Sequence, residues 1–406
     1  MEIWKWELRK IANLGILAAV VLLGIVYYYM FPSFYVRYFR NGPNAEAEFA
    51  LSAEWAAKYG VTMEPSEREE LDGQLAGEKA DFQEMLLAIA EASDAGITDY
   101  DSFCVYRDSY YDQTAAAGSV ADMEQEWLLH RIMDGTNYYR VQTLAGFMDA
   151  YDRRAERTAD RTGTDICRSA PDDDTDAMRQ RESGLMQSAR WYGYLPGCVW
   201  QSTCEYAKDL AVWCVLCNVL LLSPVLVRDR MYRTRPMQWS SRHGRAVLQT
   251  QMTAACMAAL AVTAVNLVLY GIPFLRQGPL VFRTFGLESI WSDATPWFDW
   301  TYGTYLLVLA ALITVLSAAA ALLTVFVSQY SGNYIAMLLK ALPLFVAVGA
   351  MAGSWLLDGS FYFRSLWQNA PVWGFCGMEA VMACLLLFCG MVLCMSAVRR
   401  QRRAQM

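Results

Sequence analysis

Six apolar runs, each long enough to cross a lipid bilayer, constrain the fold of this sequence more than any other feature. About 20 apolar residues in a helix span the roughly 30 Å of hydrocarbon, where only a helix or a closed barrel satisfies its own backbone. None of the runs alternates with the two-residue period of a barrel strand. The sequence therefore predicts an all-α integral membrane protein with six transmembrane helices. The runs are 11–30, 210–227, 251–272, 305–328, 341–357 and 375–398.

Basic residues gather on one side of these predicted helices. Three of them, including Lys10, precede the first run, and the loop 228–247 carries six arginines with a single acid, Asp229. Four more arginines lie between 399 and 403. With six crossings these segments share one side, which the positive-inside rule identifies as the cytoplasm. We therefore expect a multi-pass protein of a bacterial plasma membrane, with both termini cytoplasmic.

The opposite side receives a long acidic segment. Residues 32–205 contain 32 Asp and Glu against 16 Lys and Arg, so the net charge of −7 sums an acidic exterior and a basic interior. A segment of this length can bury a domain-sized core. The predicted division is 1–31 for the N-terminus and first helix, 32–205 for an extracellular, mainly helical domain, 206–398 for the other five helices, and 399–406 for a basic cytoplasmic tail.

Helix signals recur within the predicted extracellular domain. Ser66-Glu67-Arg68-Glu69, after Pro65, has the pattern of a capping box, and apolar residues then recur at helical spacing as far as Ile89. The polar stretch 161–184 predicts a loop. Further helices are expected at 98–113, 119–134 and 137–160.

A cleaved signal peptide is the alternative interpretation of the first run. Its aromatic end, from Tyr27 to Pro32, offers no small-residue cleavage site, which favours an uncleaved anchor. Residues 2–10 mix Trp, Lys and Arg, a composition typical of a short helix along the inner membrane surface.

Four cysteines fall in the predicted exterior, where disulfides persist. They are Cys104, Cys167, Cys198 and Cys204. These allow three pairings, and the bridge we prefer joins the close pair Cys198 and Cys204. Cys214 and Cys217 have Cys-x-x-Cys spacing but lie inside an apolar run, so packing is favoured over redox chemistry.

Motifs that carry chemistry are scarce. The chain has two histidines and no HExxH zinc helix, paired-Cys zinc pattern or nucleophile elbow. It also has no Gly-rich loop of the kind that cradles phosphates. We therefore expect neither an enzyme nor a metal or cofactor site in this chain. The basic loop 228–247 does not by itself indicate nucleic acid, because topology alone produces basic inner loops.

Two inner loops carry a recognisable pattern. In the first, Asp229 follows the second helix, Pro236-Met237-Gln238-Trp239-Ser240-Ser241 is a hydrophobic-polar stretch, and Gly244-Arg245 comes after it. In the second, Val327-Ser328-Gln329-Tyr330-Ser331-Gly332-Asn333 joins the fourth and fifth helices. With the basic start, six helices and a large outer insertion after the first, these loops resemble those of ATP-binding-cassette (ABC) exporter permeases of the bacterial six-helix type. That family more usually has Glu at position 229 and a Lys after the Gly-Arg.

The resemblance implies that the loop 228–247 forms a short helix that fits a groove in a separate ATPase subunit, which would bind ATP and Mg²⁺. It also implies a second permease copy or paralogue. Apolar side chains would anchor this contact and arginines would complement an acidic partner. The alternative is a loop lying on anionic lipid, to which each basic residue is attracted by ~1 kcal/mol. The implied coupling residues are Asp229, Met237, Trp239, Arg242, Gly244 and Arg245.

Three polar residues fall within the apolar runs, and a translocation path is one interpretation of them. Asn218 and Asn266 lie near the middle of the second and third helices, where hydrogen bonding between helices is the favoured alternative. Glu379 lies in the first turn of the sixth helix, close enough to the outer surface to be hydrated.

Together these features predict the permease subunit of an ABC exporter that moves an unidentified substrate. The acidic exterior would favour cationic peptides, including antimicrobial ones. The alternative is a non-transporting receptor or scaffold that acts through its extracellular domain.

Overall fold

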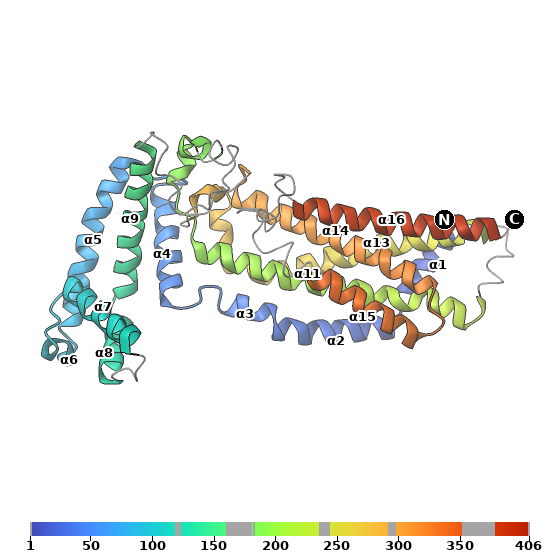
Figure 1. The fold of residues 1–406 in the computed structure, drawn as a ribbon, viewed down its shortest axis with the longest axis horizontal. Helices are drawn as coiled ribbons and strands as arrows, with labels where there is room; N and C mark the ends of the chain where they lie inside the picture. The colour runs from blue at the N-terminus through green and yellow to red at the C-terminus, as the bar shows by residue number, and fades with distance from the viewer. Residues whose placement is uncertain are drawn as a thin grey trace. The chain divides into compact units, whose positions relative to one another are not determined.

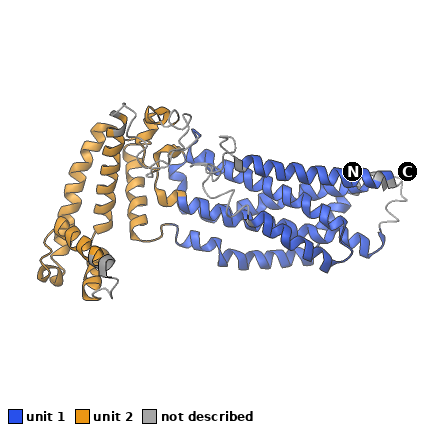
Figure 2. Ribbon diagram, viewed as in Figure 1, with its two compact units in different colours: residues 1–39, 201–283, 294–406 blue, residues 40–200, 284–293 orange. Residues whose placement is uncertain are grey.

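The computed structural model describes residues 2–117, 123–159, 181, 183–234, 244–290, 298–350 and 378–404. Among these residues every regular element is a helix, and one isolated β-bridge pairs Leu195 with Ile290. The chain divides into two compact units (Figure 2). Unit 1 is 1–39, 201–283 and 294–406, and unit 2 is 40–200 and 284–293.

Unit 1 is helical, and most of its helices are long and apolar (Figure 1). They are α1 (Glu2–Ile11), α2 (Leu14–Met30), the short α3 (Pro32–Arg37), α13 (Gly244–Leu275), α14 (Tyr302–Gln329), α15 (Tyr334–Ala350) and α16 (Met378–Ala404), with the 3-10 turn η2 (Pro279–Phe282). The long helix α11 (Gly197–Met231) belongs to unit 1 from residue 201 onward.

Four of these helices, α11, α13, α14 and α16, are long and apolar enough to cross a membrane. The pair α1 and α2, bent by 47°, makes a fifth candidate when taken as one span. Helix α15 is a shorter apolar helix, and the predicted run 341–357 extends past it into residues outside the described ranges. The described part of the chain is thus all-helical with four or five candidate spans, as an all-α membrane protein requires.

The first predicted run is divided at Ala12 and Asn13. The Asn13 side chain accepts hydrogen bonds from the backbone N–H groups of Gly15 and Ile16 and so caps the start of α2. The apolar helix therefore begins at Leu14 instead of residue 11. The preceding residues form α1, the short helix predicted from their Trp, Lys and Arg content.

Helix α14 is the centre of packing in unit 1, where it contacts α13, α15 and α16. In the run of alanines at its middle, Ala319, Ala320 and Ala321 are fully buried. Small side chains such as these let helix backbones approach closely. At Gly390 of α16, an added Cβ would lie 3.0 Å from the Cβ of Leu322. The contact of α16 with α14 therefore depends on the missing side chain at position 390.

One apolar cluster joins the segments that carry the basic residues. Ile11 of α1, Leu226 of α11, Leu248 of α13 and Ala397 of α16 are all buried in it. The helix ends that carry or flank the basic residues, in α1, α11, α13 and α16, therefore lie at one end of unit 1, as the charge pattern predicts.

Unit 2 is also helical, and three of its helices match the predicted ranges 98–113, 119–134 and 137–160 within a few residues. Helices α4 and α5 pack against α9. The elements are α4 (Pro43–Lys58), α5 (Pro65–Leu86), α6 (Ala90–Asp94), α7 (Tyr100–Ala117), α8 (Met123–Gly135), α9 (Tyr138–Ala159), and the 3-10 turns η1 (Ala189–Tyr192) and η3 (Leu287–Ser289). Most of the predicted loop 161–184 lies outside the described residues.

The start of α5 corrects the predicted capping box. The N-cap residue is Glu64, whose backbone N–H donates to Oε2 of Glu67 over 2.7 Å. Pro65 occupies the first helical position, where its fixed φ suits a helix and its missing N–H has no consequence. The capping residues therefore lie two positions earlier than the predicted pair Ser66 and Glu69.

Arg154 of α9 holds two other segments of unit 2 in place. Its side chain is buried, and the guanidinium donates to the carbonyl oxygens of Trp191 and Ile290 over 2.7 and 2.6 Å. Trp191 belongs to η1, and Ile290 directly follows η3. One side chain thus bonds segments about 100 residues apart in sequence.

We expect Gly390→Leu to lower the thermal unfolding midpoint of the detergent-solubilised protein. The new side chain would overlap Leu322, and overpacking of this kind costs ~1–3 kcal/mol. The control is Gly271→Leu in α13, where an added Cβ meets no atom within 4 Å. Equal shifts in the two variants would contradict this account of the α14–α16 contact.

We expect Arg154→Met to destabilise unit 2, because two buried carbonyl groups would lose a charged donor, at ~1–3 kcal/mol each. The neighbouring Arg153 pairs with Asp149 at the surface, with both side chains more than 60 % exposed. Arg153→Met should therefore change stability by less than ~1 kcal/mol. Limited proteolysis of the full-length protein, followed over time, would compare the two variants.

Candidate functional site

The buried carboxylate of Asp229, near the end of α11, organises the basic end of unit 1. The residue is only 5 % exposed. Its Oδ2 accepts a hydrogen bond from Nζ of Lys10 on α1 over 3.2 Å and one from Nε2 of Gln251 on α13 over 2.9 Å. A single carboxylate thereby joins three helices.

Other charged groups extend this network. Nζ of Lys10 also lies 2.8 Å from a carboxylate oxygen of Glu7, one turn earlier on α1. Arg228 donates to the backbone carbonyl of Lys10 over 3.0 Å, and Arg230 donates to the carbonyl of Ser331 over 3.1 Å at the end of α14. The base of the loop after α11 is thus held by side chains that contact α1, α13 and the turn after α14. We call Glu7, Lys10, Asp229 and Gln251 the basal network.

The predicted coupling residues fall into three groups. Asp229 is described and its carboxylate is bound within unit 1, as part of the basal network. Met237, Trp239 and Arg242 lie outside the described residues. Gly244 and Arg245 form the first turn of α13.

The two intramembrane asparagines both bond across the contact between α11 and α13, although not to each other. Nδ2 of Asn218 donates to Oγ1 of Thr263 over 3.0 Å and to the carbonyl of Cys214 over 3.0 Å. Oδ1 of Asn266 accepts a hydrogen bond from Nε1 of Trp213 over 3.1 Å. Two polar links therefore fix the register of the helix pair, in agreement with the favoured interhelical interpretation.

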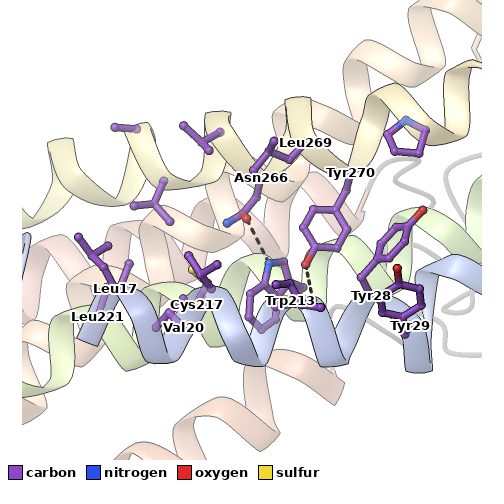
Figure 3. Close-up of a pocket in the computed structure, with 17 residues that line it drawn as sticks. Leu17, Val20, Tyr28, Tyr29, Trp213, Cys217, Leu221, Asn266, Leu269 and Tyr270 are labelled. Carbon is purple, nitrogen blue, oxygen red and sulfur yellow. Dashed lines mark hydrogen bonds between the residues drawn. The ribbon is translucent and has the colours of Figure 1, made fainter. Parts of the chain in front are cut away.

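A groove of about 770 Å³ lies beside these links (Figure 3). Residues 17–29 of α2 and 261–273 of α13 form its two sides, and Trp213, Cys217 and Leu221 of α11 complete the lining. Nearly all of these side chains are apolar. The exceptions include Asn266 and the hydroxyl groups of three tyrosines on α2 and α13.

Gly24 of α2 is the point at which α2 contacts both α13 and α11. The hydroxyl of Tyr270 on α13 donates to the carbonyl of Gly24 over 2.9 Å. A Cβ at Gly24 would lie only 2.7 Å from the ring of Trp213, so glycine is needed for this approach. Beside this contact, Asn266 is 8 % exposed, and its Nδ2 has no hydrogen-bond partner.

Two further predicted sites have different outcomes. The predicted disulfide between Cys198 and Cys204 is wrong, because the two residues lie six positions apart in one helix and neither is disulfide-bonded. Six residues of helix separate Cα atoms by about 9 Å, beyond the reach of a disulfide. The Cys198 thiol instead faces the carbonyl of Ala45, and the Cys204 thiol faces the hydroxyl of Tyr305. Glu379 is the second residue of α16, and its side chain lies outside the described set.

The described residues contain no group of three or more His, Cys, Asp or Glu arranged to hold a metal ion. The Cys104 thiol in unit 2 is a free thiol whose pKa is raised, chiefly by burial. A raised pKa keeps a thiol protonated and therefore a poor nucleophile.

Several residues of the basal network and the groove were missed by sequence reasoning. Lys10 was counted only as a topological charge, and Trp213, Tyr270 and Gly24 read as ordinary apolar-run residues. A buried ion pair between α1 and α11 has no sequence signature, because it depends on how distant segments pack. Gln251, at the first position of an apolar run, was the one available signal.

Comparison of the chain with protein-family models, with curated proteins and with solved structures gives no match.

We expect Lys10 and Asp229 to be energetically coupled. Lys10→Met and Asp229→Leu should each lower the unfolding midpoint, because the first leaves the buried carboxylate of Asp229 without a cation and the second leaves Lys10 paired with Glu7 alone. The double variant should be less destabilised than the sum of the two, with a coupling energy of about 0.5–3 kcal/mol. Arg9→Met, on the exposed face of α1 one residue away, removes the same charge and should have little effect. Strict additivity would show that the ion pair does not stabilise the protein.

Proposed function

We propose that this chain is the membrane-spanning permease subunit of an ABC exporter, driven by a separate ATPase that binds the loop 228–247. The proposal includes six transmembrane helices, cytoplasmic termini, and an extracellular domain formed by the acidic segment between the first two spans. The observation that carries it is the basal network, which braces the helix ends on both sides of this loop.

The lengths of the two flanking helices support a lever role. Helices α11 and α13 have 35 and 32 residues, so each is about 50 Å long. A bilayer's hydrocarbon core is about 30 Å thick, so helices of this length project beyond it. A force applied to the loop between them therefore acts directly on the ends of these two long helices.

The basal network connects α11 and α13 to α1. Lys10 and Asp229 join α1 to α11, and Gln251 joins α11 to α13. Because α1 continues into α2 through a bend of 47°, a shift of the braced end also acts on the first apolar helix. This arrangement suits the transmission of an external movement into the membrane.

The charge of the loop is consistent with a soluble acidic partner. It carries six arginines and one acid, and the acid is already bound by Lys10 and Gln251. Since Asp229, Arg228 and Arg230 are engaged inside unit 1, the other four arginines of the loop provide the charge for a partner. Met237 and Trp239 add the apolar side chains typical of interface anchors.

The test uses the full-length protein in proteoliposomes together with the phosphate-loop ATPase encoded nearest to it. We expect binding and stimulated ATP hydrolysis. Arg242→Ala/Trp239→Ala should weaken stimulation roughly 10- to 30-fold, as loss of an interface anchor does. The control is Arg399→Ala/Arg400→Ala, which also removes basic residues from the same end of unit 1 and should change stimulation less than about twofold.

The alternative, a receptor or scaffold acting through its acidic domain, predicts a different outcome. Scrambling 236–243 would then leave every function intact, and no ATPase would be stimulated. Failure of the protein to bind or stimulate any ATPase encoded in its genomic neighbourhood would reject the exporter proposal.

A further inference from the structure

We propose that the groove between α2, α11 and α13 binds a single linear hydrocarbon chain that carries a hydrogen-bond-accepting oxygen. The ligand is an acyl chain with an ester, carboxyl or hydroxyl group, and it comes either from a membrane lipid or from a lipophilic transported molecule. The inference rests on the groove's own geometry and does not depend on the loop 228–247 or on an ATPase.

The length of the groove matches one chain of one leaflet. Its sides are formed by residues 17–29 of α2 and 261–273 of α13. Twelve steps of helix rise correspond to about 18 Å. Half of the hydrocarbon thickness is about 15 Å, the depth that one acyl chain fills in its leaflet. The volume of about 770 Å³ is within the usual range of ligand pockets.

The groove is open to the lipid phase along an apolar rim. Val21 and Ile25 on one side, and Val265 and Leu269 on the other, are each more than half exposed. A chain can therefore enter sideways from the bilayer without displacing a polar group. The rim itself selects only for apolar character.

Selectivity comes from the Asn266 amide inside the groove. Its Oδ1 is already occupied by Trp213, whereas Nδ2 has no hydrogen-bond partner although the residue is more than nine-tenths buried. The Cys217 thiol interacts with this amide electrostatically, but the contact lacks hydrogen-bond geometry and a thiol sulfur is only a weak acceptor. A buried N–H donor without a partner selects for a ligand with an acceptor oxygen, which a pure hydrocarbon lacks.

A thin ligand suits this position better than a protein surface. The Asn266 residue is 8 % exposed and lies below a rim of branched side chains, and a helix with its side chains is about 10–12 Å across. A single acyl chain can bring an oxygen to Nδ2 while its methylene groups fill the apolar length. We therefore assign the groove to a lipid-like chain and not to a second copy of this protein.

The test is photo-crosslinking of the full-length protein in nanodiscs that contain a trace of diazirine-labelled phosphatidylcholine. A parallel sample contains the free diazirine fatty acid instead. Peptide mapping should place the label on residues 17–29 and 261–273 several-fold above the exposed face of α16. Preference for the phospholipid would identify a structural lipid, and preference for the free acid would identify a transported or signalling molecule.

Two substitutions on α13 form a matched pair. Val265→Trp fills the groove and should reduce labelling about tenfold, whereas Val268→Trp should leave it unchanged. Both residues are similarly exposed, at 56 % and 57 %, but only Val265 lines the groove. Equal labelling in the two variants, or labelling spread evenly over α2, α13 and α16, would overturn the proposal.

A third variant, Asn266→Leu, tests whether the groove recognises an acceptor oxygen on the ligand. Competition between an unlabelled fatty acid methyl ester and an alkane of equal length should favour the ester in the wild-type protein. In Asn266→Leu the two competitors should become equal while the total labelling persists. This ratio separates loss of the donor from loss of fold. Efficient crosslinks between two copies at Val21 or Val265 would show instead that a second protomer covers the groove.

Discussion

The need to satisfy polar groups in an apolar environment determines how α11 sits among its neighbours. Along this helix, Trp213 and Asn218 bond to α13, and the carbonyl of Ser223 accepts a hydrogen bond from Ser328 of α14. At its end, Asp229 bonds to α1 and α13. Since water cannot replace these partners inside a bilayer, sliding α11 by one residue would break several bonds at once. The apolar packing around α14 forms most of the core of unit 1. The polar bonds fix the position of α11 along its axis relative to α1, α13 and α14.

The positions where this constraint is incompletely met are informative. Several buried side-chain polar atoms of the described residues have no partner, and two of them are Nδ2 of Asn266, which lines the groove, and one carboxylate oxygen of Glu7 in the basal network. In native proteins buried polar atoms rarely stay unpaired. The two atoms lie at the two features for which we propose binding or coupling.

Sequence analysis predicted the helical class, four or five of the six apolar spans and four helices of unit 2, because these follow from local periodicity and capping. It failed where the outcome depended on packing. Helix α4 was missed, although Gly42-Pro43 is a helix start signal, because its Ala- and Glu-rich sequence has weak apolar periodicity. The Cys198–Cys204 bridge was wrong because α11 begins earlier than the apolar run and places both thiols on one continuous helix. The groove and the basal network could not be predicted, since they depend on which faces of α1, α2, α11 and α13 meet.

The groove and the basal network share the same helix pair, and this has a thermodynamic consequence. Groove residues on α2 and α13 approach each other through Gly24 and Tyr270, while the basal network fixes α11 and α13 to α1. A chain that binds one spacing of α2 and α13 more tightly shifts the helix pair toward that spacing. By reciprocity, a partner that moves the basal end changes the affinity of the groove by the same factor. A structural lipid would bind all arrangements alike and shift none of them, whereas a transported molecule must bind them differently. The difference in chain affinity with and without the partner therefore distinguishes the two kinds of ligand.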